Sequence, residues 1–182
     1  MSASKTIGSR EVQAALTRLT AAIAGRHQSA ARNLVFLGIA NGGVELARRC
    51  AAAFGARAGT LDISFHRDDI GRHPIPKEFE PTHIPADVHG ATVVLVDDVL
   101  FSGRTVKAAL DEIFDHGRPT KVELAVLVDR GGRRLPVAAD YVGLHVTASA
   151  EEKVRVKLDP KNPQRDAIQI EPASAAARDS AL

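Results

Sequence analysis

The sequence has no tryptophan, one tyrosine and one cysteine among its 182 residues. A single cysteine excludes an intrachain disulfide. No apolar run approaches the roughly 20 residues that span a bilayer, so we expect no transmembrane helix and no membrane partner. The first eight residues also lack the charged and then apolar pattern of a secretory signal. These absences together predict a cytoplasmic protein.

A strong excess of charge of one sign is also missing. The formal net charge is +2, and aromatic residues make up 4% of the chain. A nucleic acid could therefore bind only at a local basic patch, and stacking of bases on aromatic side chains is not expected as the main binding mode. Arginines that could form such a patch occur in the first third of the chain, although the sequence does not place them on one face: Arg10, Arg18, Arg26, Arg48 and Arg49.

Apolar runs at residues 34–39, 93–96 and 122–128, the last containing one acid at Glu123, predict strands that are buried on both faces. Helical spacing of apolar residues between these runs implies a mainly parallel sheet flanked by helices. The length suits a single α/β domain with room for an added flap or hood. We expect this domain to span residues 1–172, with a small hood from the terminal segments and a frayed tail at 173–182.

Residues 66–90 are polar and contain four prolines, in a stretch far longer than the roughly 4 to 6 residues of a typical connection. We interpret this segment as a functional flap, with Arg67, Asp68 and Asp69 at its root. Its histidines do not follow the spacing of zinc sites, and no second cysteine is available. We therefore interpret them as solvated loop residues: His66, His73, His83 and His89.

The stretch from Val93 to Thr105 is the most informative part of the chain. A buried strand ends in Asp97 and Asp98, and Ser-Gly-Arg-Thr then opens a helix. Ligands of open α/β sheets bind beyond the carboxyl ends of the strands, where a helix N-terminus attracts anions. Two carboxylates beside a phosphate turn suit a phosphorylated sugar. Polar strand ends at 40–43 and 129–134 should meet at the same edge.

The acidic pair is open to two other interpretations. In a signalling receiver domain the acidic pair follows the first strand, and the phosphorylated aspartate comes later. Here the pair follows about the third strand and leads directly into Ser-Gly-Arg-Thr. The other alternative is a buried strand that merely ends in surface acids.

The stretch 93–105 resembles the phosphoribosyl pyrophosphate (PRPP) motif of type I phosphoribosyltransferases. Three further segments resemble the PyrR subgroup: Phe-His-Arg-Asp-Asp-Ile from Phe65, Phe-Asp-His-Gly-Arg-Pro from Phe114, and Leu-Ala-Val-Leu-Val-Asp-Arg-Gly-Gly-Arg-Arg-Leu-Pro from Leu124. This subgroup comprises bifunctional pyr operon regulators with uracil phosphoribosyltransferase activity. The likeness runs from about Val12 to Leu158.

The resemblance implies roles for particular residues. Asp97 and Asp98 would hold the ribose hydroxyls, and together with Arg67 they are the predicted catalytic residues. The implied PRPP-binding stretch comprises Val93, Val94, Leu95, Val96, Asp97, Asp98, Val99, Leu100, Phe101, Ser102, Gly103, Arg104 and Thr105, of which those from Leu100 onward would bind the 5′-phosphate. The implied pyrophosphate loop is Ala40, Asn41, Gly42 and Gly43. The implied flexible loop contains Arg67, Asp68 and Asp69, and the implied base-binding residues are Val128, Asp129 and Arg130, with Val128 or Arg130 facing uracil.

The resemblance also implies ligands and partners. These are PRPP with Mg²⁺, uracil, the nucleotides UMP and UTP, pyr leader RNA, and further copies of the chain in a dimer or larger homo-oligomer. One departure concerns the pyrophosphate loop, because better-studied members have Thr-Arg-Gly where this chain has Asn41-Gly42-Gly43. Arg67 or Arg104 would then supply the missing guanidinium. The alternative function is an RNA-binding attenuator or nucleotide sensor with weak or no catalysis.

Overall fold

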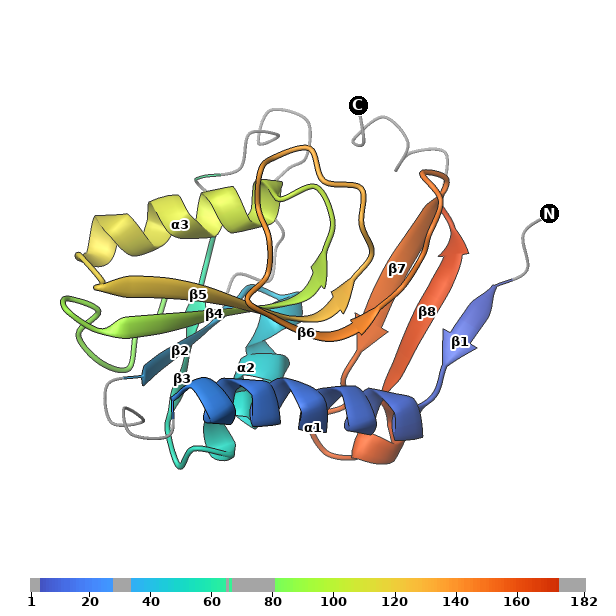
Figure 1. The fold of residues 1–182 in the computed structure, drawn as a ribbon, viewed down its shortest axis with the longest axis horizontal. Coiled ribbons are helices and arrows are strands. Elements are labelled where there is room, and N and C mark those ends of the chain that lie inside the picture. Colours follow the sequence, from blue (N-terminus) through green and yellow to red (C-terminus); the bar gives the residue numbers. More distant parts are fainter. Residues whose placement is uncertain (1–3, 28–33, 65, 67–80, 174–182) are drawn as a thin grey trace.

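The computed structural model describes residues 4–27, 34–64, 66 and 81–173. Its central sheet contains five parallel strands in the order β3-β2-β4-β5-β6. Helices α1 and α2 lie on one face of this sheet and α3 covers the other (Figure 1). The bounds are α1 (Ser9–Arg26), β2 (Leu34–Ile39), α2 (Gly42–Ala52), β3 (Ala58–Leu61), β4 (Thr92–Leu100), α3 (Arg104–His116), β5 (Lys121–Asp129) and β6 (Tyr141–His145).

Successive residues of the central strands pack into opposite layers. In β4, Val94 and Val96 belong to the core under α1 and α2, whereas Val93 and Leu95 belong to the core under α3. Helices cover both faces, which explains why this strand is continuously apolar. Complete burial of each such side chain stabilises the fold by about 1.5–3 kcal/mol. The predicted parallel sheet flanked by helices is confirmed, and it gives the loops at its carboxyl edge a rigid base.

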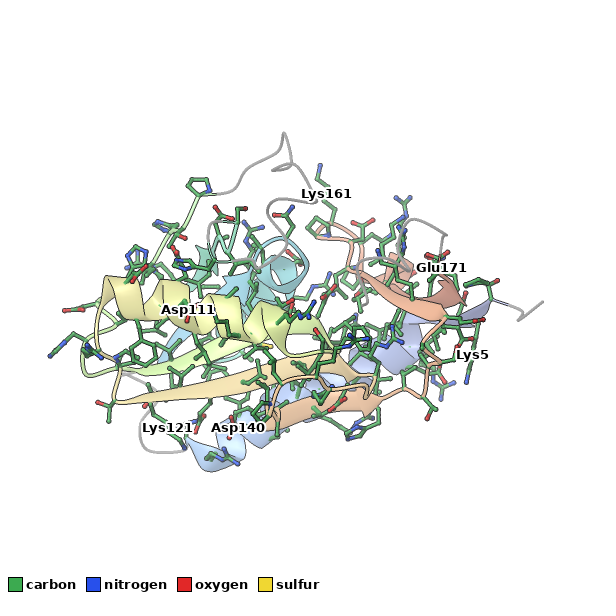
Figure 2. All side chains as sticks on the ribbon, turned by 90° about the horizontal axis from the view of Figure 1, so that it is seen from above. Lys5, Asp111, Lys121, Asp140, Lys161 and Glu171 are labelled. Carbon is green, nitrogen blue, oxygen red and sulfur yellow. The ribbon has the colours of Figure 1, made fainter. Side chains whose placement is uncertain are left out.

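A second, smaller sheet forms the predicted hood. It joins β1 (Lys5–Ile7), β8 (Ala167–Pro172) and β7 (Glu152–Lys157) in antiparallel order β1-β8-β7. This sheet stands beyond the end of the central sheet at which α3 begins (Figure 1). Lys5 and Glu171 of the hood lie at one end of the molecule, and Lys121, the first residue of β5, lies toward the other end (Figure 2). The hood therefore faces the carboxyl edge of the parallel strands.

A buried acid connects the hood to the helices. Asp166 follows the short 3₁₀ helix η2 (Pro163–Arg165), and its side chain is fully buried. The carboxylate accepts hydrogen bonds from Gln13 of α1 at 2.6 Å and from Arg49 of α2 at 2.5 Å. The backbone N–H of Asp159 donates a third at 2.8 Å. These contacts hold the hood in a fixed position above the strand ends.

Most of the predicted flap and the predicted tail lie outside the described residues, which leave out 67–80 and 174–182. The division of the chain into domain, flap and tail therefore stays a prediction. His83 pairs with Thr60 in an antiparallel bridge, so the segment that leads into β4 runs beside β3. Across the part of the chain that the structure describes, no helix is both long and apolar enough to cross a membrane.

Candidate active site

Three segments that are distant in sequence meet at the carboxyl edge of the sheet. Strand β4 lies between β2 and β5, with Gly38 paired to Val96 and Leu100 paired to Asp129. The turn after β2, the end of β4 and the loop after β5 are therefore neighbours. The sequence predicted this convergence from the parallel arrangement alone.

The acidic pair lies within β4, close to its end. Asp97 is 5% exposed and Asp98 is half-buried, and the backbone N–H of Asp98 donates to Oδ1 of Asp97 at 3.0 Å. Burial, and next the negative charge of Asp98, raise the pKa of Asp97 well above its ordinary value. Burial also raises the pKa of Asp98. Two carboxylates with raised pKa values at a strand end are typical of a functional site, and hydroxyl donors or a cation would stabilise their charged forms.

The turn after β2 brings its backbone against these carboxylates. The peptide bond between Ala40 and Asn41 is cis, and Gly42 opens α2. A Cβ atom on Gly42 would lie 2.5 Å from Cγ of Asp98. Only glycine leaves room for the carboxylate at this position. The positive end of the α2 dipole is thereby placed beside the acidic pair, as an anion site requires.

The turn after β4 leads into α3 through Ser102 and Gly103. Gly103 has φ of +93° and is the N-cap of α3. The N–H of Arg104 donates to Oγ of Ser102 at 3.4 Å, and the half-exposed Arg104 and exposed Thr105 form the first turn. The first N–H groups of a helix have no partner within the helix, so this turn offers donors to a phosphate.

Arg133 holds the loop after β5 against this phosphate turn. Its guanidinium donates to the carboxylate of Asp129 at 2.5 Å and to the carbonyls of Phe101 at 2.8 Å and Leu100 at 3.2 Å. A further bond runs from Nε to the carbonyl of Val137 at 3.1 Å. The sequence marked this region only as a polar strand end and gave Arg133 no role. One side chain thus fixes the predicted base loop relative to the predicted phosphate loop.

The two residues predicted to face the base have different surroundings. Val128 is fully buried in the core, so its side chain does not reach the site. The guanidinium of Arg130 lies 4.2 Å from the ring centroid of Phe101 and donates to the carbonyls of Ser149 and Glu152, each at 2.8 Å. Burial lowers the pKa of Arg130. Arg130 therefore connects the hood to the phosphate turn, and its contact with a base stays a prediction.

The remaining predicted site residues divide into two groups. Residues 93–96 are buried in β4 and form part of the core on which the site rests. Arg67, Asp68 and Asp69 lie outside the described residues. The structure thus brings together the turn at 40–43, the stretch 97–105 and the loop from Asp129, with Arg133 as the connection that the sequence analysis did not identify.

The fold and these loops define a phosphoribosyltransferase. The family description "Phosphoribosyl transferase domain" matches residues 10–160. A hypoxanthine-guanine phosphoribosyltransferase from Bacillus anthracis superposes with a TM-score of 0.64 at 17% identity, over 92% of this chain and 96% of that chain. The hypoxanthine phosphoribosyltransferase of Trypanosoma cruzi gives a TM-score of 0.63 at 19% identity, over 91% and 95%. At these identities the likeness concerns the fold, and it confirms the predicted type I phosphoribosyltransferase fold.

Proteins of similar sequence show to which group of phosphoribosyltransferases this chain is related. "Bifunctional protein PyrR" of Chloroflexus aurantiacus is 49% identical over 155 residues, which cover 81% of this chain and 84% of that protein. The protein of the same name from Leifsonia xyli is 45% identical over 176 residues, covering 91% and 94%. The chain belongs to the PyrR family, as the motifs at 65, 93, 114 and 124 predicted.

Proposed function

We propose that this protein transfers the phosphoribosyl group of PRPP to uracil, forming UMP and releasing pyrophosphate. The observation that carries the proposal is the position of Asp97 and Asp98 between two helix N-termini, that of α2 at Gly42 and that of α3 beyond Gly103. PRPP has ribose hydroxyls between two phosphate-bearing groups, so its chemistry matches this order of acid and anion sites. Membership of the PyrR family supports uracil as the base.

The reaction breaks the bond between C1 of the ribose and pyrophosphate and forms a bond from C1 to a uracil nitrogen, which loses its proton. Positive charge develops on the sugar as the first bond lengthens. The fixed carboxylates of Asp97 and Asp98 stabilise that charge electrostatically. The N-terminal N–H groups of α2 and α3 hold the pyrophosphate and the 5′-phosphate. No side-chain nucleophile is needed for this displacement.

Mg²⁺ is part of the proposal as a companion of PRPP. Mg²⁺ prefers oxygen ligands, and the phosphate oxygens of its substrate supply several of them. The carboxylate of Asp98 would supply a further oxygen ligand. This side chain is half-buried and burial raises its pKa, so a bound cation would favour its charged form. When bound with PRPP, the ion offsets negative charge on the leaving pyrophosphate.

The relatives are called bifunctional, and we propose a second role in regulating pyrimidine genes through UMP- or UTP-dependent binding of pyr leader RNA by a homo-oligomer. Three of the arginines considered for a basic patch have structural contacts. Arg18 donates to the carbonyl of Gly143, Arg26 binds Asp140, and Arg49 binds Asp166. Arg10 and Arg48 are exposed, and Arg48 contacts Glu45 only at 3.9 Å, so these two remain available for RNA. Such binding should weaken steeply with salt.

An initial-rate assay with PRPP, Mg²⁺ and a panel of free bases tests the catalytic proposal. Uracil should be converted to UMP, and hypoxanthine, guanine and adenine should give at most background rates. Faster conversion of a purine base than of uracil would contradict the assignment of the base. Filter binding of pyr leader RNA at several salt concentrations, with and without UMP, tests the regulatory role separately.

A further inference from the structure

Four titratable side chains gather where the chain leaves β3 and meets the second half of α3. Nε2 of His66 lies 3.0 Å from Oε2 of Glu112 and 3.3 Å from Oδ2 of Asp115. On its other side, Oε1 of Glu112 lies 3.1 Å from Nε2 of His116. Glu112 is eight residues into α3, so the cluster is about 12 Å along the helix axis from the phosphate turn. Glu112 therefore lies well away from the phosphate turn of the candidate active site.

The contacts of His66 leave an electrostatic imbalance. A single ring nitrogen carries at most one hydrogen, yet oxygens of two different carboxylates converge on it at 3.0 and 3.3 Å. One N–H can satisfy only one of them well. A dication at the centre would attract all three ligand atoms and would compensate both negative charges.

We propose that His66, Glu112 and Asp115 form a binding site for a divalent transition-metal ion, with Zn²⁺ as the best-fitting ion. The three ligand atoms lie within 4.8 Å of one another. Metal–ligand bonds of about 2.0–2.2 Å in tetrahedral geometry separate neighbouring ligands by about 3.3–3.6 Å, close to the 3.0 and 3.3 Å that His66 already makes to the two carboxylates. An imidazole with two carboxylates suits Zn²⁺ better than Mg²⁺, which prefers oxygen ligands alone.

The surroundings of Glu112 orient it for this role. Its Oε1 accepts a hydrogen bond from Oγ1 of Thr82 at 2.6 Å and contacts Nε2 of His116, which leaves Oε2 directed toward His66. The two contacts at Oε1 therefore hold the carboxylate in one orientation, as outer-shell partners do for metal ligands.

Spacing along the sequence could not reveal this site. Glu112, Asp115 and His116 follow the i, i+3 and i+4 pattern of one helix face, but His66 comes from a segment 46 residues earlier. The prediction that the histidines of residues 66–90 are solvated loop residues is thus replaced for His66, which is half-buried against two carboxylates.

Isothermal titration of the metal-free full-length protein with Zn²⁺, in buffer containing millimolar Mg²⁺, tests the proposal. We expect about one Zn²⁺ per chain and a loss of affinity of about tenfold or more in His66→Ala and in Asp115→Asn. The matched control is His89→Ala, which removes an exposed histidine of the same polar segment and should bind Zn²⁺ as the wild type does. Asp115 is mostly exposed, so Asp115→Asn should fold normally.

A Co²⁺ titration followed by visible absorption gives a second measurement. Absorption bands of Co²⁺ with nitrogen and oxygen ligands should appear in the wild type and disappear in Glu112→Gln. Equal Zn²⁺ affinity in the wild type and His66→Ala, or displacement of Zn²⁺ by millimolar Mg²⁺, would overturn the proposal. In that case the cluster is an ion-pair contact between residue 66 and α3.

Discussion

The α-carbon of Gly42 lies against the carboxylate of Asp98, so closely that an added Cβ would be 2.5 Å from Oδ2 of that side chain. The pyrophosphate loop and the acidic pair therefore form one packed unit. The family resemblance implies that better-studied members have an arginine at the position that Gly42 occupies here. In this chain, the carboxylate of Asp98 occupies the space next to the backbone.

Substitution of Gly42 should disturb catalysis through Asp98. The added methyl group of Gly42→Ala must displace the carboxylate, and a displacement of about 1 Å at a reacting centre can lower turnover about 100-fold. Steady-state rates of UMP formation measure the effect. Gly25→Ala is the matched control, since nothing lies within 4 Å of its added Cβ inside α1. That variant should keep full activity and gain about 0.5–1 kcal/mol of stability. Unchanged turnover in Gly42→Ala would contradict the packed arrangement.

Arg133 should matter for activity more than for folding. Its guanidinium reaches the carboxylate of Asp129 and the backbone carbonyls of Leu100, Phe101, Gly131 and Val137, and lysine cannot make these contacts together. We expect Arg133→Lys to raise the KM for uracil and lower kcat/KM about tenfold or more. Arg165→Ala, at a largely exposed position in η2, should leave both parameters unchanged. Wild-type kinetics in Arg133→Lys would show that the loop does not need this contact.

The acidic pair could be predicted from sequence because its signal is local. A run of branched apolar residues, two acids and a Ser-Gly-Arg-Thr turn lie within 13 positions, and the strand and helix confirm that order. Arg133 could not be predicted, because its partners include backbone carbonyls some 30 residues away, which leave no pattern in sequence. Strand β1 was also missed, since three mostly exposed residues carry almost no periodic signal.

The outcome at Val128 has a physical reason. From the sequence, Val128 is expected at a polar strand end, where side chains face a ligand. Helices cover both faces of β5, so its last apolar residue is still inside the core. The polar loop begins one residue later, at Asp129.

Arg49 should contribute strongly to stability through Asp166. In Arg49→Ala the buried carboxylate of Asp166 loses its charged partner, and breaking a buried pair from one side costs about 3–5 kcal/mol. Denaturant unfolding measures this loss. The neighbouring Arg48 is the matched control, because it is 61% exposed and contacts Glu45 only at 3.9 Å. Arg48→Ala should change the unfolding free energy by less than about 0.5 kcal/mol. Similar losses in the two variants would mean that the hood does not depend on the Asp166 contact.

Stability should fall in acid because of Glu123, which is fully buried near the start of β5. Burial by itself would raise the pKa of Glu123, but hydrogen bonds from Lys121, Tyr141 and His27 outweigh it and lower the pKa from 4.5 to about 2. The resulting stabilisation, on the order of 3 kcal/mol, is fully present above pH 4.5 and is lost as pH falls toward 2.

Unfolding free energies of the wild type and Glu123→Gln between pH 7 and pH 2.5 test this expectation. The variant should be less stable at pH 7 and should approach the wild type at low pH, since the protonated acid and the amide then carry the same charge. A difference that stays constant over this range would contradict the lowered pKa.

The most direct test of the account compares UMP formation by the wild type, Asp97→Asn and Asp98→Asn, with uracil, PRPP and Mg²⁺ at saturating concentrations. Asparagine keeps the shape of each side chain and removes its charge, so the fold should survive, as circular dichroism and unfolding curves can confirm. Loss of a preorganised charge of this kind lowers kcat about 100- to 1000-fold, and we predict such a loss in each variant. Full turnover in a folded Asp97→Asn or Asp98→Asn protein would contradict the assignment of this acidic pair as the centre of the active site.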